Sequence, residues 1–146
     1  MNENKFKLTQ SIEDYLEVMY NLKMTKGVIR VSDIATELGV KPPSVVEAVD
    51  KIFRLGLISR EKYGEIKLNK KGTEIAKNIL HKHNTLKKFL KILDVDEKTA
   101  EKEACAMEHI LSDSTINKLE IFTEILTAQE KHGNLDESFK QYKNRD

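Results

Sequence analysis

The sparse glycines and prolines constrain the fold of this chain more than any other feature. Six glycines and two prolines divide its 146 residues into segments in which apolar side chains mostly recur at helical spacing. The first such stripe runs from Ser11, a candidate N-cap, to Met24, and Gly27 ends it. The pattern predicts a mainly α-helical protein whose strands are few and short.

The first half of the chain has the element order of a winged helix-turn-helix domain. Pro42 and Pro43 fit a turn followed by a first helical position, because proline lacks an N–H but is tolerated there. Ser32 is the candidate N-cap of the helix before this turn. The predicted elements are a helix at 11–24, a short strand at 28–31, helices at 33–38 and 44–55, and two strands within 57–68.

In this architecture the second short helix enters the major groove of DNA, and the hairpin lies along the backbone or the minor groove. Serine and glutamate can meet base edges, and proline can contact a thymine methyl group. The predicted reading surface is Lys41, Pro42, Pro43, Ser44 and Glu47. The wing residues Arg60, Lys62, Tyr63 and Lys67 are predicted to contact phosphates, which positions the protein without reading sequence.

The distribution of charge supports this interpretation by region. The net charge of the whole chain is only +1, but residues 41–77 hold nine basic and five acidic side chains. Lysines are ordinarily solvated surface residues, and some winged helices bind only proteins. The combination of turn, wing and local positive charge favours DNA.

The second half reads as three further helices. The predicted ranges are 73–93, roughly 97–111 and 115–129. We therefore predict a DNA-binding domain at 1–72, an all-helical domain at 73–130 with 73–93 as a linking helix, and a polar tail at 131–146.

A set of metal-ligand residue types stands in the second half. Cys105, Glu108 and His109 are three and four residues apart, which brings a thiolate, a carboxylate and an imidazole to one helix face. These ligands suit a divalent transition ion. Glu101 lies one turn earlier, and His83 lies on the linking helix, where His81 is the weaker candidate.

Asp14 and Glu17 present two further carboxylates on the first helix, three residues apart. Each piece alone has an ordinary explanation, such as a small core cysteine, a surface ion pair or first-turn charge that suits the helix dipole. Their co-occurrence on three helices of a chain with a DNA-binding half favours a metal site.

Four motifs together resemble the diphtheria-toxin-repressor and manganese-transport-regulator family. They are Ser-Ile-Glu-Asp-Tyr-Leu-Glu at 11–17, Val-Ser-Asp-Ile-Ala at 31–35, Pro-Ser-Val-Val at 43–46 and Cys-x-x-Glu-His at 105–109. The resemblance implies a metal-activated homodimeric repressor, with a winged helix followed by a helical domain that dimerises and binds metal. The ligands that it implies are Asp14, Glu17, His83, Cys105, Glu108 and His109, with Glu101 as a further candidate.

The resemblance is mixed with respect to the metal. Iron-type members carry Cys at the place of Cys105 and Met at the place of Asp14, whereas manganese-type members carry Glu and Asp there. Lys87 stands where iron-type members have an extra carboxylate ligand, and we expect no SH3-like domain. Because a thiolate is a soft ligand, we slightly favour Fe²⁺ over Mn²⁺, and Co²⁺, Ni²⁺ or Zn²⁺ could substitute in vitro.

Several classes of protein are disfavoured. A single Cys cannot form an internal disulfide, no apolar run approaches a membrane span, and the first ten residues lack a signal-peptide core. We expect a cytoplasmic protein that is not an enzyme, since no metalloprotease motif, phosphate loop or nucleophile elbow is present. The expected partner is double-stranded DNA, and the two-fold symmetry of a homodimer predicts a pseudo-palindromic operator. The alternatives are a metal-independent winged-helix regulator and a metal-binding enzyme.

Overall fold

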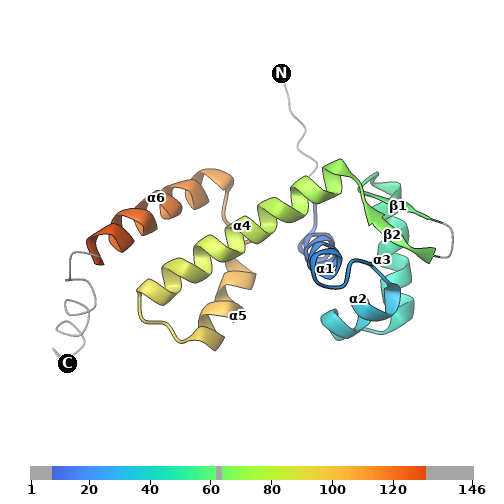
Figure 1. Ribbon diagram of the computed structural model, residues 1–146, viewed down its shortest axis with the longest axis horizontal. Helices are drawn as coiled ribbons and strands as arrows, with labels where there is room; N and C mark the ends of the chain where they lie inside the picture. The colour runs from blue at the N-terminus through green and yellow to red at the C-terminus, as the bar shows by residue number, and fades with distance from the viewer. Residues whose placement is uncertain (1–7, 62–63, 131–146) are drawn as a thin grey trace, which may run out of the picture. The chain divides into compact units, whose positions relative to one another are not determined.

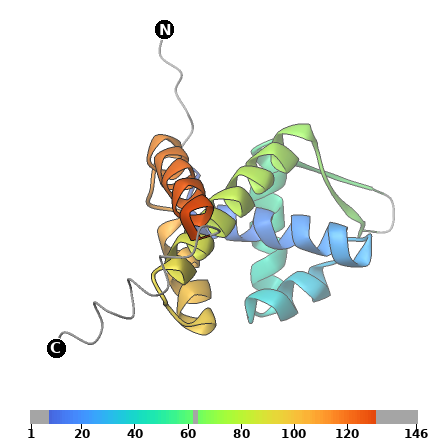
Figure 2. The same cartoon turned by 60° about the vertical axis from the view of Figure 1, so that its left-hand side comes forward.

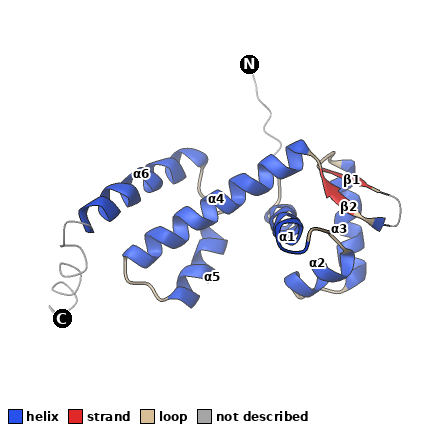
Figure 3. Cartoon of the chain, viewed as in Figure 1, coloured by secondary structure: helices blue, strands red, loops and turns tan. Residues whose placement is uncertain are grey.

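The computed structural model describes residues 8–61 and 64–130. It divides into two compact units, and the boundary in the chain falls between Leu80 and His81. Helix α4 (Lys70–Ile92) therefore contributes residues to both units. Helices dominate the described residues, and their strands form a single hairpin (Figure 3). The predicted mainly α-helical class is confirmed. Among the described helices, none has the length and apolar content of a membrane span.

The first unit contains three helices and the hairpin (Figure 1). They are α1 (Gln10–Lys26), α2 (Val31–Leu38), α3 (Pro42–Arg54), β1 (Ile58–Arg60) and β2 (Ile66–Leu68). The strands are antiparallel, with Ile58 opposite Leu68 and Arg60 opposite Ile66. This is the predicted order of a winged helix-turn-helix domain, in which α3 is the recognition helix and the hairpin is the wing.

The core of the first unit fixes which face of α3 is available. Leu16 and Met19 of α1, Ile34 of α2 and Val45 and Ile52 of α3 are all fully buried in one cluster. Because one side of α3 packs into this core, the opposite side of the helix is exposed to solvent. The exposed residues include the start of the helix, where the predicted reading surface lies.

Several predicted helix starts are wrong by one to three residues. Thr9, and not Ser11, caps α1: its extended backbone lets its Oγ1 accept from the N–H of Ile12 at 3.4 Å, whereas Ser11 is already helical. Arg30 precedes α2 without a side-chain cap, so Ser32 lies inside the first turn. The strand predicted at 28–31 is an isolated bridge between Ile29 and Ile66.

The turn between α2 and α3 forms as predicted, with Gly39 in the left-handed region at φ 64°. Helix α3 begins at Pro42, two residues before the predicted start. Helix α4 begins at Lys70 because the Asn69 side chain accepts from the N–H of Gly72 at 2.9 Å. Gly72 therefore lies within the helix, against the Leu57 carbonyl, where a Cβ atom would clash.

The second unit packs α5 (Glu97–Met107) and α6 (Asp113–Glu130) on the second half of α4 (Figure 2). Its core consists of Leu86, Leu90, Ala100, Ala104 and Ile116. Helix α5 ends at Met107 and not near Leu111, because the N–H groups of Ile110 and Leu111 both turn back to the Met107 carbonyl. Glu108 and His109 consequently lie in the turn that follows α5. The tail predicted at 131–146 lies outside the described residues.

Candidate DNA-binding surface and metal centre

The predicted reading residues all lie on the exposed beginning of α3. Lys41 precedes the helix, Pro42 and Pro43 form its first turn, and Ser44 and Glu47 follow within the next turn. Their side chains are exposed. The positions meet the requirement of a recognition helix, which contacts base edges mainly with its N-terminal residues.

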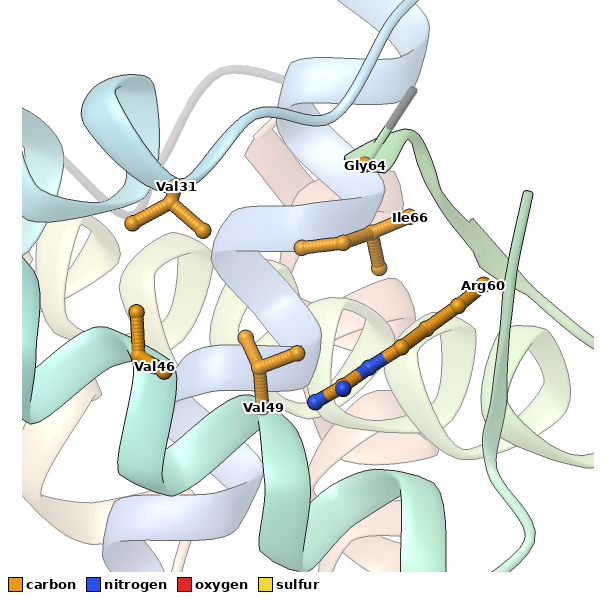
Figure 4. Close-up of a pocket in the computed structure, with 6 residues that line it drawn as sticks. All are labelled: Val31, Val46, Val49, Arg60, Gly64 and Ile66. Atoms are coloured by element: carbon orange, nitrogen blue, oxygen red, sulfur yellow. The ribbon is translucent and has the colours of Figure 1, made fainter. Parts of the chain in front are cut away.

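A small pocket separates the recognition helix from the wing (Figure 4). Val46 and Val49 of α3 lie on one side, and Arg60 and Ile66 of the wing lie on the other, with Val31 and Gly64 completing the lining. Apart from Arg60, the lining side chains are apolar.

Arg60 ties the wing to the recognition helix. Its guanidinium pairs with the Asp50 carboxylate and lies 5.3 Å from the centre of the Phe53 ring, and both partners belong to α3. Phosphate contact by Arg60 stays a prediction, as does that by Lys67, whose ammonium is 3.6 Å from Glu61. Lys62 and Tyr63 lie outside the described residues.

His83 is the centre of a cluster of donor groups in the second unit. Its Nδ1 lies 2.8 Å from Glu108 Oε2 and 3.7 Å from Cys105 Sγ, and its Nε2 lies 3.1 Å from Glu101 Oε1. His109 Nε2 is 3.3 Å from the other Glu108 oxygen, Oε1. The five predicted ligands of this unit are thereby linked through His83 and Glu108.

The donor set fits a divalent transition ion. One ligand atom from each of His83, Glu101 and Cys105 lies within 4.8 Å of the others, which combines imidazole, carboxylate and thiolate. Glu108 is only 2% exposed, and its Oε1 accepts no hydrogen bond with good geometry from the described part of the chain, although His109 lies near it. Burying a carboxylate oxygen without a hydrogen-bond donor costs free energy of folding. A cation bound at that oxygen would compensate its charge.

Lysines of α4 hold the acidic face of α5. Lys87 Nζ lies 2.6 Å from Glu97 and 2.9 Å from Glu101, and Lys91 Nζ lies 2.5 Å from Glu97. The hydrogen bonds from Lys87 and Lys91 lower the pKa of Glu97 to about 2, and that from Lys87 lowers the pKa of Glu101. The same bonds raise the pKa of Lys87 above its usual range. All three groups are therefore charged at neutral pH.

The remaining metal candidates are Asp14, Glu17 and His81. Asp14 and Glu17 lie one turn apart on α1 in the first unit, where both are half-buried. His81 Nε2 is 3.2 Å from Glu120 of α6, and its being the weaker candidate stays a prediction.

Two family models match the chain in succession. The iron-dependent repressor N-terminal DNA-binding domain matches residues 7–66, and the iron-dependent repressor metal-binding and dimerisation domain matches residues 69–135. An uncharacterized HTH-type transcriptional regulator of Methanocaldococcus jannaschii is 46% identical over 119 residues, which cover 80% of this chain and 95% of that protein. The chain belongs to the iron-dependent repressor family, which includes the diphtheria-toxin repressor and the manganese transport regulators.

Other members of the family were also matched. The HTH-type transcriptional regulator MntR of Listeria welshimeri is 41% identical over 111 residues, which cover 76% of this chain and 78% of MntR. The solved structure of the manganese regulator SloR has a TM-score of 0.71 and 30% identity, and covers 80% of this chain. This chain spans 55% of the length of SloR.

Membership in the family decides between the predicted classes of function. The members are metal-dependent DNA-binding transcriptional regulators, so the resemblance seen in the sequence is confirmed and the enzyme alternative is rejected.

The ion pairs between the lysines of α4 and the glutamates of α5 were not predicted from the sequence. A signal for them exists, since Lys87 and Lys91 on α4 and Glu97 and Glu101 on α5 are both spaced four residues apart. That spacing gives each helix one charged stripe, but only the packing of the two helices shows that the stripes face each other.

Proposed function

We propose that this chain is a cytoplasmic, homodimeric repressor that binds DNA when it holds Fe²⁺. The observation that carries the proposal is the buried pair of His83 and Glu108, 2.8 Å apart, beside the Cys105 thiol. One oxygen of this buried carboxylate accepts no hydrogen bond from the residues that the structure describes, and soft and borderline donors lie beside it. Such an arrangement is unfavourable as core packing and suits a cation.

In this proposal His83, Cys105, Glu108 and His109 supply the ligands of the second unit. Asp14 and Glu17 are the proposed ligands from α1, supported by their spacing on one helix face and by the family resemblance. When bound, the ion supplies a positive charge that carboxylates from different helices can share.

The proposed mechanism is a shift of population. An ion that recruits ligands from both units favours one arrangement of the DNA-binding domain with respect to the dimer. If that arrangement fits DNA, metal and DNA must strengthen each other's binding by the same factor. With two reading heads related by two-fold symmetry, the proposed operator is pseudo-palindromic, and by resemblance it controls metal-uptake genes.

The second copy in the proposed dimer is expected to cover the apolar face of α6. Ile121, Phe122 and Ile125 are 58%, 50% and 51% exposed, although all are large and apolar. The Phe122 ring lies 6.4 Å from that of Phe89 on α4. The family model that spans this region describes a dimerisation domain, which supports a second copy as the occupant.

Two features support opposite choices of metal. Asp14 and the manganese regulators among the relatives favour Mn²⁺, whereas the Cys105 thiolate favours Fe²⁺. We assign Fe²⁺ because the thiolate is the one soft donor in the cluster, and its contact with His83 places it beside the central ligand.

Replacing Cys105 by glutamate tests this assignment. We expect Cys105→Glu to move the ratio of Fe²⁺ to Mn²⁺ affinity at least about tenfold toward Mn²⁺, because a hard carboxylate replaces a soft thiolate. The measurement is an anaerobic titration of the chain with each ion, since both Fe²⁺ and the thiol oxidise. Ala106→Glu, one residue further on an exposed position, is the matched control. An unchanged ratio in Cys105→Glu would remove Cys105 from the site.

A further inference from the structure

Lys87 connects the acidic face of α5 to the donor cluster. Its ammonium contacts both Glu97 at 2.6 Å and Glu101 at 2.9 Å, and its side chain is only 28% exposed. In the described part of the chain Lys91 pairs with Glu97 and not with Glu101, and its side chain is 52% exposed. Lys87 is therefore the more enclosed of the two cations, and it is the one that reaches a carboxylate of the donor cluster.

Glu101 divides its two oxygens between two partners. Oε2 faces Lys87, whereas Oε1 lies 3.1 Å from His83 Nε2. A dication that took Glu101 as a ligand would lie close to the Lys87 ammonium, and the repulsion between like charges at a few ångströms disfavours that arrangement. Glu108 differs in this respect, because its ion-pair partners among the described residues are His83 and His109 and include no lysine or arginine.

We propose that Lys87 is a built-in counter-cation that holds Glu101 in an ion pair between α4 and α5 and so excludes Glu101 from the metal site. The ion is then held in this unit by His83, Cys105, Glu108 and His109 without Glu101. Lys87 acts on metal affinity through Glu101 and does not touch the ion, so it is a positioning residue. This inference rests on the proposed function and specifies its ligand set.

The first test is a double-mutant cycle read by Co²⁺ binding. Co²⁺ is the probe because its thiolate complexes absorb in the near ultraviolet and report on Cys105. Glu101→Gln is expected to change the Co²⁺ affinity by less than about threefold and to keep the absorption band. Lys87→Met is expected to tighten Co²⁺ binding about tenfold by freeing Glu101, and the gain should vanish in the Lys87→Met, Glu101→Gln double variant.

The second test uses the metal-free protein in excess chelator. Lys87→Met should lower the melting temperature by about 2–4 °C at low salt, and the loss should shrink at 1 M salt, where exposed charges are screened. Lys88→Met, on the adjacent exposed lysine of α4, is the matched control and should leave the melting temperature unchanged. Equal melting temperatures of Lys87→Met and Lys88→Met at low salt would overturn the counter-cation role, regardless of the metal-binding results.

The outcomes separate this inference from the proposed function. A wild-type chain that takes up no Co²⁺ would overturn both. A wild-type chain that binds Co²⁺, combined with a loss of tenfold or more in Glu101→Gln, would make Glu101 a ligand and overturn this inference alone. A Lys87→Met chain with unchanged Co²⁺ affinity would have the same consequence.

Discussion

Glu108→Gln is expected to weaken metal binding by about 100-fold or more and to leave the fold in place. Replacing a residue that merely orients a metal ligand typically lowers metal affinity 10–100-fold. Replacing a carboxylate that binds the ion directly should lower metal affinity at least as much. Glutamine keeps the shape of the side chain and an oxygen that can accept from His83, but it removes the charge that the ion needs. In the structure this charge is buried, with Oε2 2.8 Å from His83.

The melting temperature of the metal-free protein separates a loss of metal binding in Glu108→Gln from a loss of folding. Because removing a buried charge relieves its desolvation, we expect Glu108→Gln to melt in chelator within a few degrees of wild type. Glu103→Gln, on an exposed position of α5, is the control and should keep full metal affinity. Near-normal metal binding in Glu108→Gln would place the ion elsewhere, whereas a loss of helical circular dichroism would make Glu108 a structural residue.

Placing two aspartates on the apolar face of α6 is expected to break the dimer. Ile121 and Ile125 lie one turn apart, and each is more than half exposed in the single chain. Burying large apolar side chains contributes about 1.5–3 kcal/mol each, and an aspartate in their place would be left buried without a partner. We therefore expect Ile121→Asp with Ile125→Asp to raise the dimer dissociation constant at least about 100-fold.

Sedimentation equilibrium of wild type and variant measures this effect directly. Ser114→Asp with Asn117→Asp adds the same charge to exposed positions near the start of α6 and should leave the dimer intact. The double aspartate variant at Ile121 and Ile125 should also lose tight DNA binding, because a single reading head contacts only half of an operator. A variant that remains dimeric would show that another surface joins the two copies.

The order of elements could be predicted from the sequence because its signals are local. Gly39 ends α2 in the left-handed conformation, and the prolines after Lys41 suit the first turn of α3. The caps were less predictable, since Thr9 and Ser11 both carry a hydroxyl and only the backbone conformation decides between them. The same holds for Asn69, whose side chain extends α4 beyond the predicted break at Gly72.

The residue types of the candidate site could be predicted from the sequence, but the contacts between its side chains could not. The spacing predicted that Cys105, Glu108 and His109 share one helix face, whereas Glu108 and His109 lie in the turn that follows α5. It could not show that His83, more than twenty residues earlier, is the central contact, since that depends on how α5 packs against α4. Lys87 illustrates the same limit, because its carboxylate partners are on another helix.

Control of DNA binding by metal can be measured as one ratio of dissociation constants. A duplex is first selected by the Fe²⁺-loaded chain from a random library under anaerobic conditions. Its dissociation constant is then measured at one fixed ionic strength with saturating Fe²⁺ and with chelator, because salt alone changes such affinities strongly. We expect the duplex to bind roughly 5–150-fold more tightly with Fe²⁺, the usual range of coupling between two sites. Equal dissociation constants in Fe²⁺ and in chelator would show that metal does not control DNA binding.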